Sequence, residues 1–410
     1  MIVLTGATGF VGSHIVELLR ADTDFLLVSR DPAEAKRRFP NVNACRYDDL
    51  HGRNLAGATV IHLAARNNDR PGTAQEFCAV NVDLLMDVAT SVRAAGARRF
   101  INLCSTHAIQ PKPSDVYGTS KQKGARQLVE FWPEGVINLY APAIYSQEFR
   151  GRLALLNRFP KAIRPFVLSI VRQISPVLSI ENLSSSLHQL ITEEHQHLDD
   201  PFMHERYVAD PVSANGLFAA LKRLIDLSAA MVVAVLAGWA MLLIAAYIRL
   251  DSQGPAIFAQ RRVGQNGHIF TCYKFRTMAV GTAHVATHFA TAASVTRAGR
   301  FLRRTKLDEL PQIANVFLNQ MSLVGPRPCL PMQEELIARR DKRGVLRLKP
   351  GITGLAQIND IDMSNPARLA AWDDRYRVFR TLKADLLILL RTVVGGGSGD
   401  RTAPAMSAKR

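Results

Sequence analysis

The sequence predicts an α/β protein in three parts: a doubly wound parallel sheet, a membrane-embedded helix, and a smaller, mainly α-helical basic domain. Three observations lead to this prediction. Short apolar strands alternate with helical stretches through the first half of the chain, a pattern typical of parallel sheets. Residues 227–248 contain no charged side chain and are long enough to cross a bilayer as a helix. Residues 221–410 hold 28 basic and 13 acidic side chains, so they carry nearly all of the net charge of +16.

The overall composition excludes disordered and fibrous proteins, because 48% of the 410 residues are hydrophobic and 21% are charged. Five cysteines, odd in number and widely spaced, fit neither a disulfide framework nor a zinc cluster, which indicates a reducing compartment. We expect four segments along the chain. They are a nucleotide-binding domain over 1–215, a membrane helix over 220–250, a second folded domain over 251–394 and a disordered tail over 395–410.

A glycine-rich turn follows the first predicted strand. Gly6, Gly9 and Gly12 have the spacing GxxGxxG and lead directly into a predicted helix. In such a strand–turn–helix unit, backbone N–H groups at the helix N-terminus hold a pyrophosphate. The arrangement predicts a Rossmann-like dinucleotide site made by Gly6, Gly9, Phe10, Val11 and Gly12.

The second predicted strand ends at Ser29-Arg30-Asp31, where dinucleotide-binding folds recognise the adenosine ribose. An arginine at this place suits a 2′-phosphate, so Arg30 favours NADP, whereas Asp31 leaves NAD open. The strand VIHLAA ends in small residues, and Ala64 lets the backbone approach a flat cofactor. We therefore expect NADP, or NAD, at this edge of the sheet.

Hydroxyl, phenol and ammonium groups follow the next strand in a specific order. The strand FINLCSTHAIQ ends in Ser105 and Thr106, and Tyr117 and Lys121 follow at the helical spacing i, i+4. An ammonium beside a phenol favours the phenolate, which lowers the tyrosine pKa towards a range useful for proton transfer. A hydroxyl at the strand end can polarise a substrate carbonyl. These residues predict an acid–base site.

Over roughly residues 1–210 the chain resembles the extended short-chain dehydrogenase/reductases, the nucleotide-sugar epimerase and dehydratase family. The matching segments are TGATGFVG, the pair Asp49-Leu50, VIHLAA, Asn81, CST, YGTSK and NLYAPAIYS. The resemblance implies that Thr106, or its neighbour Ser105, forms a catalytic triad with Tyr117 and Lys121 that oxidises or reduces the sugar 4-position. The cofactor contacts implied by the resemblance are Asp49, Leu50 and Lys121. The substrate lobe is shorter than in the family.

The apolar segment is expected to dip into the membrane and return to the same face. Lys222 and Arg223 precede it, and Arg249 and two further arginines, 261 and 262, follow it. Positive residues favour the cytoplasmic side of a membrane, and here both ends carry them. A re-entrant helix needs a break whose freed backbone groups are satisfied again, and Gly238 is the obvious position for one. A single spanning helix is the alternative.

Basic residues punctuated by Gly and Pro follow the apolar segment and indicate a rigid anion-binding surface. The cations suited to a diphosphate are Lys274, Arg276, Arg303 and Arg327. Asp308 and Glu309 lie among them near a helix start, with Gln312 and Asn315 on the helix face of Asp308. Cations favour the ionised carboxylate, which can act as a covalent nucleophile. A solvated acidic pair at a helix start is the more common outcome of such a pattern.

From about Lys222 to Val394 the chain resembles the bacterial sugar transferases, the monotopic phosphoglycosyl transferases. The matching segments are GPAIFAQRRVG, YKFRTM, LDELPQIANVF, SLVGPRP and KPGITGLAQIN. The resemblance implies Mg²⁺-dependent transfer of a sugar-1-phosphate from a UDP-sugar to a polyprenol phosphate, with release of UMP. It implies that Asp308 forms a phospho-sugar intermediate with help from Glu309, and that Asp308 lies near the Mg²⁺. The implied substrate contacts are Lys274, Arg276, Arg303, Gln312, Arg327 and Asp373.

Together these inferences describe a bifunctional membrane enzyme of surface glycan biosynthesis at the cytoplasmic face of a bacterial inner membrane. The first domain would reduce or epimerise a UDP-sugar, and the second would load the product's sugar-1-phosphate onto undecaprenyl phosphate. A first domain that only senses a dinucleotide is the alternative, and a homodimer is left open. Nucleic acid is not an expected partner despite the pI of about 10.0, because the charge surrounds an apolar segment without a recognisable nucleic-acid module.

Overall fold

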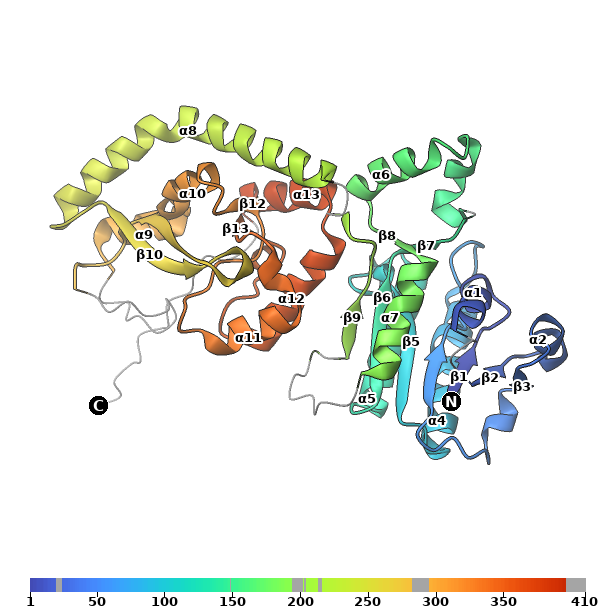
Figure 1. The fold of residues 1–410 in the computed structure, drawn as a ribbon. Coiled ribbons are helices and arrows are strands. Elements are labelled where there is room, and N and C mark those ends of the chain that lie inside the picture. The colour runs from blue at the N-terminus through green and yellow to red at the C-terminus, as the bar shows by residue number, and fades with distance from the viewer. Residues whose placement is uncertain are drawn as a thin grey trace, which may run out of the picture. The chain divides into compact units, whose positions relative to one another are not determined.

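The computed structural model describes residues 1–19, 24–147, 149–193, 202, 204–212, 216–281 and 295–395. The chain divides into two compact units, residues 1–211 and 212–410, which are described separately (Figure 1). The predicted tail over 395–410 lies outside the described residues beyond Gly395.

The first unit is built on a seven-stranded sheet in the order β3-β2-β1-β4-β5-β6-β9, with every neighbouring pair parallel. The strands are β1 Ile2–Thr5, β2 Phe25–Val28, β3 Asn43–Cys45, β4 Thr59–His62, β5 Arg99–Ser105, β6 Val136–Ala141 and β9 Glu205–Tyr207. The strand order reverses between β1 and β4, which is the switch point where doubly wound sheets bind dinucleotides. The predicted α/β class with a doubly wound parallel sheet is confirmed.

Helices cover both faces of this sheet, and each face has its own apolar core. The helices are α1 Phe10–Leu19, α2 Pro32–Arg38, α3 Ala74–Cys78, α4 Leu85–Ala94, α5 Val116–Phe131 and α7 Ile180–Thr192, with a π-helical turn, η2, over Ala79–Leu84. Buried side chains of α1 and α7 pack on one face, and those of α4 and α5 pack on the other. Because both faces are covered, the strands are nearly continuous runs of apolar residues.

A small lobe extends the first unit beyond the main sheet. It contains β7 Ala143–Tyr145, the 3₁₀ segment η4 Gly151–Arg158, α6 Arg164–Ile174 and β8 Val177–Ser179, and β7 pairs in parallel with β8. Asp210 connects the parts of the lobe: its carboxylate accepts hydrogen bonds from Tyr145 (2.6 Å), Arg172 (2.6 Å) and Asn182 (2.7 Å). The assignment of this lobe as a shortened substrate lobe stays a prediction.

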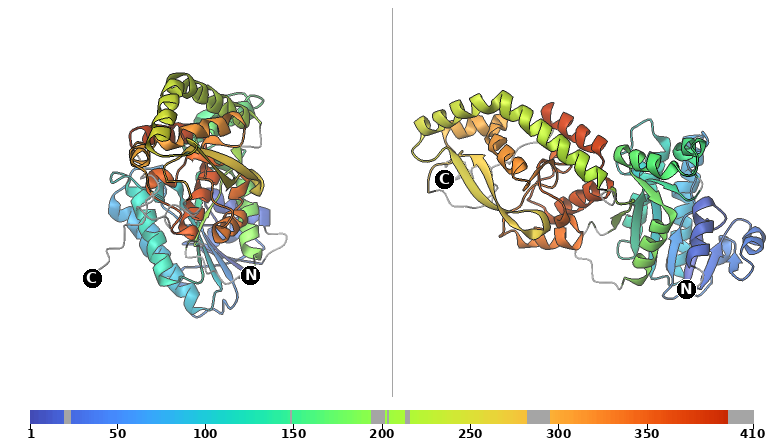
Figure 2. Two further views of the ribbon diagram at one scale, coloured as in Figure 1. Left: turned by 90° about the vertical axis from the view of Figure 1, so that its left-hand side faces the viewer. Right: turned by 45° about the horizontal axis from the view of Figure 1, so that its top comes forward.

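The second unit combines the long helix α8 Leu217–Asp251 with short strands and surrounding helices (Figures 1 and 2). Its strands are β10 Ile257–Val263 and β11 Ile269–Phe275, which form an antiparallel hairpin, and the parallel pair β12 Ser322–Val324 and β13 Gly351–Thr353. Its helices are α9 Arg297–Thr305, η9 Leu307–Gln312, α10 Ile313–Phe317, α11 Glu334–Lys342, α12 Pro366–Phe379 and α13 Leu382–Val393. The predicted long apolar helix and the mainly helical second domain are both present.

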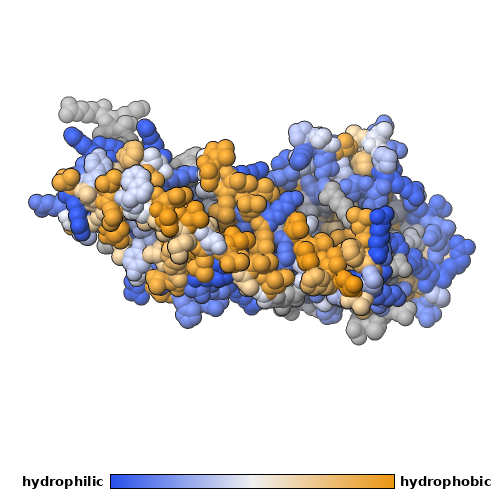
Figure 3. Space-filling model, turned by 90° about the horizontal axis from the view of Figure 1, so that it is seen from above, coloured by the Kyte–Doolittle hydropathy of each residue, from blue (hydrophilic) through white to orange (hydrophobic). Residues whose placement is uncertain are grey.

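Helix α8 passes through Gly238 without interruption, so the expected break at this residue is wrong. The helix curves over the unit instead, as Figure 1 shows. It is long and apolar enough to cross a membrane by length and composition, and only 6% of its most apolar window is buried. Its exposed large side chains include Val235, Leu236, Trp239 and Leu242. Figure 3 shows extensive apolar surface on the face of the molecule seen from above.

Both ends of α8 are fixed to the same compact unit. At the N-terminal end, the Lys222 ammonium lies 2.6 Å from the Asp385 carboxylate of α13, and Arg223 donates to the carbonyl of Val316 at 2.7 Å. At the C-terminal end, Arg276 donates to the carbonyl of Ser252 at 2.7 Å. A helix whose two ends lay on opposite sides of a bilayer about 30 Å thick could not make both sets of contacts with one compact domain.

Candidate functional site

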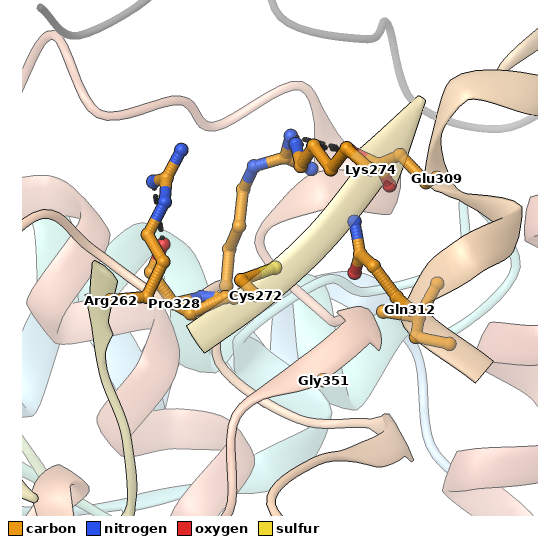
Figure 4. Close-up of a pocket in the computed structure, with 9 residues that line it drawn as sticks. Arg262, Cys272, Lys274, Glu309, Gln312, Pro328 and Gly351 are labelled. Atoms are coloured by element: carbon orange, nitrogen blue, oxygen red, sulfur yellow. Dashed lines mark hydrogen bonds and ion pairs between the residues drawn. The ribbon is translucent and has the colours of Figure 1, made fainter. Parts of the chain in front are cut away.

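A polar pocket in the second unit brings together residues from β10, β11, η9 and the loops after β12. Figure 4 shows its lining, which is Arg262, Cys272, Lys274, Glu309, Gln312, Arg327, Pro328, Gly351 and Ile352. Four of the predicted site residues therefore meet here: Lys274, Glu309, Gln312 and Arg327. The sequence-based prediction did not include Arg262 or Cys272.

Glu309 is held between two cations at this pocket. Its Oε1 lies 3.0 Å from Lys274 Nζ and 2.8 Å from a terminal nitrogen of Arg327, and all three side chains are mostly buried. Charge-assisted hydrogen bonds of this length fix the orientation of a carboxylate. Glu309 thereby places two cations next to its neighbour Asp308, so the dyad is not a solvated acidic pair.

The Asp308 carboxyl is partly buried, and burial raises its pKa to about 6. This value already includes the upward effect of the Glu309 charge and the opposing effects of Lys274, Arg327 and Arg303 on the pKa. At neutral pH most of this carboxyl is ionised, yet it is poorly hydrated and surrounded by positive charge. These conditions suit a carboxylate nucleophile that attacks an anionic phosphoryl group.

Two features fix the segment that carries the dyad. Lys306, between α9 and η9, adopts a left-handed conformation with φ of 58°, which reverses the chain just before Asp308. Asn315 is fully buried and clamps α10 to β11: it donates to the Thr271 carbonyl at 2.6 Å and accepts from the Tyr273 N–H at 3.1 Å. The sequence spacing placed Asn315 on the helix face of Asp308. In the structure, Asn315 connects α10 to β11 and so helps to fix the segment that carries Asp308.

Arg303 lies in α9, close enough to Asp308 to lower the pKa of its carboxyl. Its Nε donates to the Thr277 hydroxyl at 3.0 Å, while its buried Nη1 has no hydrogen-bond partner among the described residues. A buried guanidinium nitrogen without a partner is costly unless a ligand uses it. Arg303 is thus positioned to donate to a phosphate oxygen near Asp308.

The structure does not bring Arg276 and Asp373 into the pocket. The Arg276 guanidinium is buried at the C-terminal end of α8 and donates to backbone carbonyls there, where its charge also complements the helix dipole. Asp373 is buried in α12 and accepts two hydrogen bonds from Arg340, at 2.9 and 2.7 Å. Arg340 in turn donates to the Arg327 carbonyl at 2.9 Å, so Asp373 helps to position Arg327 of the pocket through Arg340. Neither Arg340 nor this indirect role was predicted.

The described residues contain no group of three His, Cys, Asp or Glu side chains that could hold a metal ion by themselves. Mg²⁺ is commonly bound through one or two carboxylates together with substrate phosphates. Within the described part of the chain, Asp308 has no ion pair with a cation, unlike Glu309, so it fits such a shared site. The Mg²⁺ assignment stays a prediction.

In the first unit, the glycine turn has the shape of a phosphate cradle between β1 and α1. Gly6 has φ of +75°, and a side chain there would lie 2.8 Å from the backbone nitrogen of Ala64. A side chain at Gly12 would lie 2.2 Å from the Gly6 carbonyl oxygen. Only glycine fits both positions. Phe10 and Val11 begin α1, so their N–H groups point to the edge of the sheet where β1 and β4 end.

The predicted cofactor contacts near the ends of β2 and β3 differ in their surroundings: some form hydrogen bonds within the protein or are buried, and Arg30 is exposed. Asp31 caps α2 by accepting from the N–H groups of Ala33 and Glu34, whereas Arg30 is exposed. The Asp49 carboxylate accepts from the Arg46 N–H at 2.9 Å, and Leu50 is buried in the core. With Asp31 engaged in capping, the positive side chain of Arg30 is the more suitable ribose-side contact.

Two of the predicted triad groups meet at the end of β5 and the start of α5, and the hydroxyl partner of Tyr117 is Ser105. Ser105 hydrogen-bonds the Tyr117 hydroxyl. The expected lowering of the Tyr117 pKa is wrong, because burial raises it to about 12. Lys121 is buried too, and its ammonium donates to the Leu103 carbonyl at 3.4 Å instead of stabilising a phenolate. Tyr117 is therefore protonated at neutral pH.

Sequence reasoning missed the polar neighbours of Tyr117. His107 Nδ1 lies 2.7 Å from the Asp115 carboxylate, and the His107 ring meets the Tyr117 ring edge-on at 5.8 Å. Asn81, in the π-helical turn, donates to Ser120 at 3.0 Å and so ties η2 to the helix that carries Tyr117. Asn81 belonged to a matching segment, but the sequence held no signal that paired His107 with Asp115.

Comparison with known families gives one match for each unit. Residues 217–396 match the family described as bacterial sugar transferase, and residues 2–180 match the NAD dependent epimerase/dehydratase family.

Known proteins related to the chain match its second unit. The uncharacterized sugar transferase EpsL of Bacillus subtilis is 38% identical over 185 residues, which cover 43% of this chain and 89% of that protein. The UDP-glucose:undecaprenyl-phosphate glucose-1-phosphate transferase of Klebsiella pneumoniae is 42% identical over 149 residues, 35% of this chain and 32% of that protein. The chain spans less than half the length of such longer relatives.

Among solved structures, MoeE5 in complex with UDP-glucose and NAD is similar to the first unit. The TM-score is 0.38 at 19% identity, over 54% of this chain and 81% of that chain. The fold of the first unit rests on its own strand order, independently of this similarity.

Proposed function

The chain belongs to the bacterial sugar transferase family, and from this membership we propose that its second unit transfers a sugar-1-phosphate from a UDP-sugar to undecaprenyl phosphate, releasing UMP. The observation that carries the proposal is the Asp308–Glu309 dyad. Glu309 is paired with Lys274 and Arg327, and the Asp308 carboxyl lies close enough to feel the charge of both cations. The relative from Klebsiella pneumoniae is named for this reaction with UDP-glucose.

In the proposed reaction, an Asp308 carboxylate oxygen attacks the β-phosphorus of the UDP-sugar. A bond forms between this oxygen and phosphorus, the bond to the α-phosphate oxygen breaks, and UMP leaves with the electron pair. An oxygen of undecaprenyl phosphate then attacks the same phosphorus and regenerates the free carboxylate. Lys274, Arg303 and Arg327 offset the negative charge that gathers at phosphorus, and Mg²⁺ held with Asp308 would add positive charge.

The test is to incubate the full chain in lipid nanodiscs with Mg²⁺, undecaprenyl phosphate and a panel of UDP-sugars. UMP release that requires the lipid phosphate, together with a lipid-linked sugar phosphate found by mass spectrometry, supports the assignment. Absence of UMP release with every UDP-sugar refutes the transferase assignment. The same spectra identify the sugar.

The transferase rate is expected to depend on pH through Asp308. Its pKa is raised to about 6, and only the ionised form is nucleophilic. The ionised fraction is nearly complete above this pKa and is lost as the pH falls through it. UMP release at saturating substrate should therefore drop about tenfold between pH 7 and pH 5. A profile that stays flat over this range, while circular dichroism shows an intact fold, would contradict Asp308 as the titrating nucleophile.

We propose that α8 lies in one leaflet of the bacterial inner membrane with the catalytic unit at the cytoplasmic face. Its outer face is apolar, its polar ends bind one compact unit, and α13 adds exposed Leu386, Leu387 and Leu390. This arrangement supports the same-side topology reached from the flanking charges, without a break at Gly238.

Cysteines introduced singly at Leu217 and His268 test this topology, since both lie in the second unit on either side of the apolar segment. In sealed vesicles of known orientation, a membrane-impermeant maleimide is expected to label both from the same side. Labelling from opposite sides would restore a spanning helix. The unmodified chain controls for its own cysteines.

For the first unit we propose an NADP-dependent reduction of a UDP-sugar ketone, with epimerisation as the second possibility. A protonated Tyr117 supports the reductive direction, because reducing a carbonyl requires a proton donor. Ser105 would bind the carbonyl oxygen beside it. The cofactor, when bound, would supply the hydride, and the glycine turn and Arg30 would hold its phosphates.

Cofactor preference is expected to follow Arg30. Replacing Arg30 by Asp removes a positive charge from the ribose end and should raise the KM for NADPH at least about tenfold, while NADH is little affected. Arg126→Asp, an equally exposed change on α5, is the matched control. Equal KM values for NADPH in the Arg30 variant and the parent would contradict the NADP assignment.

A non-catalytic dinucleotide sensor is the competing function for the first unit. The contact of Lys121 with the Leu103 carbonyl, rather than with a phenolate, favours it. The experiment that separates the two functions is a Tyr117 substitution, described below.

A further inference from the structure

The lobe of the first unit presents an apolar surface that nothing in that unit covers. Helix α6 is apolar on two sides: Val167, Leu168 and Val171 face the lobe core. Its outer side carries Ile163, Phe166, Ile170 and Ile174, at the helical spacing i, i+3, i+7 and i+11. Phe166 is 65% exposed and Ile174 is 54% exposed. Leu155, 62% exposed, and Phe159 extend the same surface from η4 (Figure 3). We call these six residues the α6 patch.

The segment that carries the α6 patch is basic. Residues 149–180 contain six Lys or Arg and no Asp or Glu, although the first unit as a whole is close to neutral. Arg158 and Lys161 are exposed beside the patch. An aromatic-bearing apolar helix face flanked by basic side chains is the composition of helices that lie in the interface of an anionic bilayer.

The chain also brings this unit to a membrane. Only residues 212–216 separate the end of the first unit from the start of α8. Six backbone links span at most about 20 Å. A surface tethered so closely to a membrane helix meets lipid at high effective concentration, so weak interfacial contacts are enough to hold it.

We propose that the α6 patch inserts into the headgroup region of an anionic membrane and docks the first unit there. The bilayer is favoured over a protein partner because the apolar side chains lie mostly along one helix, and because the segment 149–180 that carries them is basic and contains no acidic residue. This inference goes beyond the transferase and relies on it only for the membrane placement of α8. Docking would turn this lobe towards the lipid surface.

The test uses the full chain in nanodiscs that contain phosphatidylglycerol and nitroxide-labelled lipid. Single cysteines at Phe166, at Leu18 and at Leu236 carry an environment-sensitive fluorophore in a Cys78→Ser background, since the other native cysteines are buried. Leu18 is the matched control: it is an exposed apolar residue of α1 in the same unit, at 47% exposure. Leu236 reports on α8.

We expect nitroxide lipid to quench the probes at 166 and 236 more than about twofold, as burial about 5–10 Å into the interface implies, and to leave the probe at 18 unaffected. Replacing Arg158 and Lys161 by Gln, or omitting phosphatidylglycerol, should reduce quenching at 166 but not at 236. An unquenched probe at 166 with quenching at 236 overturns the docking alone. A blue-shifted but unquenched probe at 166 means that protein covers the patch, and overturns it too. Loss of quenching at 236 refutes the membrane placement of α8 itself.

Discussion

Replacing Asp308 by Asn is expected to reduce UMP release by at least about 10³-fold, because the change removes the attacking oxygen's charge and keeps the shape of the side chain. The amide should not disturb the fold, since Asp308 makes no ion pair at short distance among the described residues, whereas Glu309 holds both cations. Initial rates of UMP release in nanodiscs, compared with thermal unfolding of the same samples, measure the effect.

The same variant separates a covalent from a direct mechanism. With a UDP-sugar and no lipid acceptor, the parent chain should gain the mass of one sugar phosphate and release one equivalent of UMP, and Asp308→Asn should do neither. Glu335→Gln, which loses an exposed ion pair with Arg339 on α11, is the matched control and should behave as the parent. An Asp308→Asn variant with more than about a tenth of the parental rate would remove Asp308 from the nucleophile's role.

Replacing Tyr117 by Phe is expected to lower NADPH oxidation with the correct UDP-sugar ketone by about 10²–10⁴-fold, the usual contribution of a positioned proton donor. The ring contacts with Phe77 and His107 are retained, so the site keeps its packing. Spectrophotometry of NADPH together with analysis of the sugar product measures the loss.

UMP release from an already reduced UDP-sugar should be unchanged in Tyr117→Phe, because the transferase dyad lies in the other unit. Tyr207→Phe in β9, which removes a hydroxyl that donates to the Glu205 carboxylate, is the control. If Tyr117→Phe consumes NADPH and forms product like the parent, the sensor function is correct and the reductase is not.

The sequence was sufficient for features that depend on local pattern. The glycine turn, the charge-free helix and the dyad among cations each have a spacing that physical chemistry restricts to few structures, and a parallel sheet follows from the alternation of strands and helices. Side-chain partners across the fold were not accessible in this way. Arg276 and Asp373 match positions of substrate contacts in the family, yet Arg276 donates to carbonyls at the end of α8 and Asp373 accepts from a buried guanidinium.

The Tyr117 site shows why electrostatics could not be predicted from spacing. Tyr and Lys at i, i+4 share a helix face, but the pKa depends on desolvation and on where the ammonium points. Burial dominates at Tyr117, and Lys121 turns to a carbonyl. Two adjacent hydroxyl residues, Ser105 and Thr106, look equally suitable in the sequence. Only the geometry at the end of β5 shows which of them contacts Tyr117.

The attachment of both ends of α8 to one domain has a consequence for the cell. Under the function proposed above, an enzyme held in a single leaflet would meet its polyprenyl acceptor only there and would leave the head group of its product on the side where nucleotide sugars are made. The diphosphate of that product would be far too polar to cross hydrocarbon unaided. The proposal therefore requires a separate translocating protein that carries the product outward.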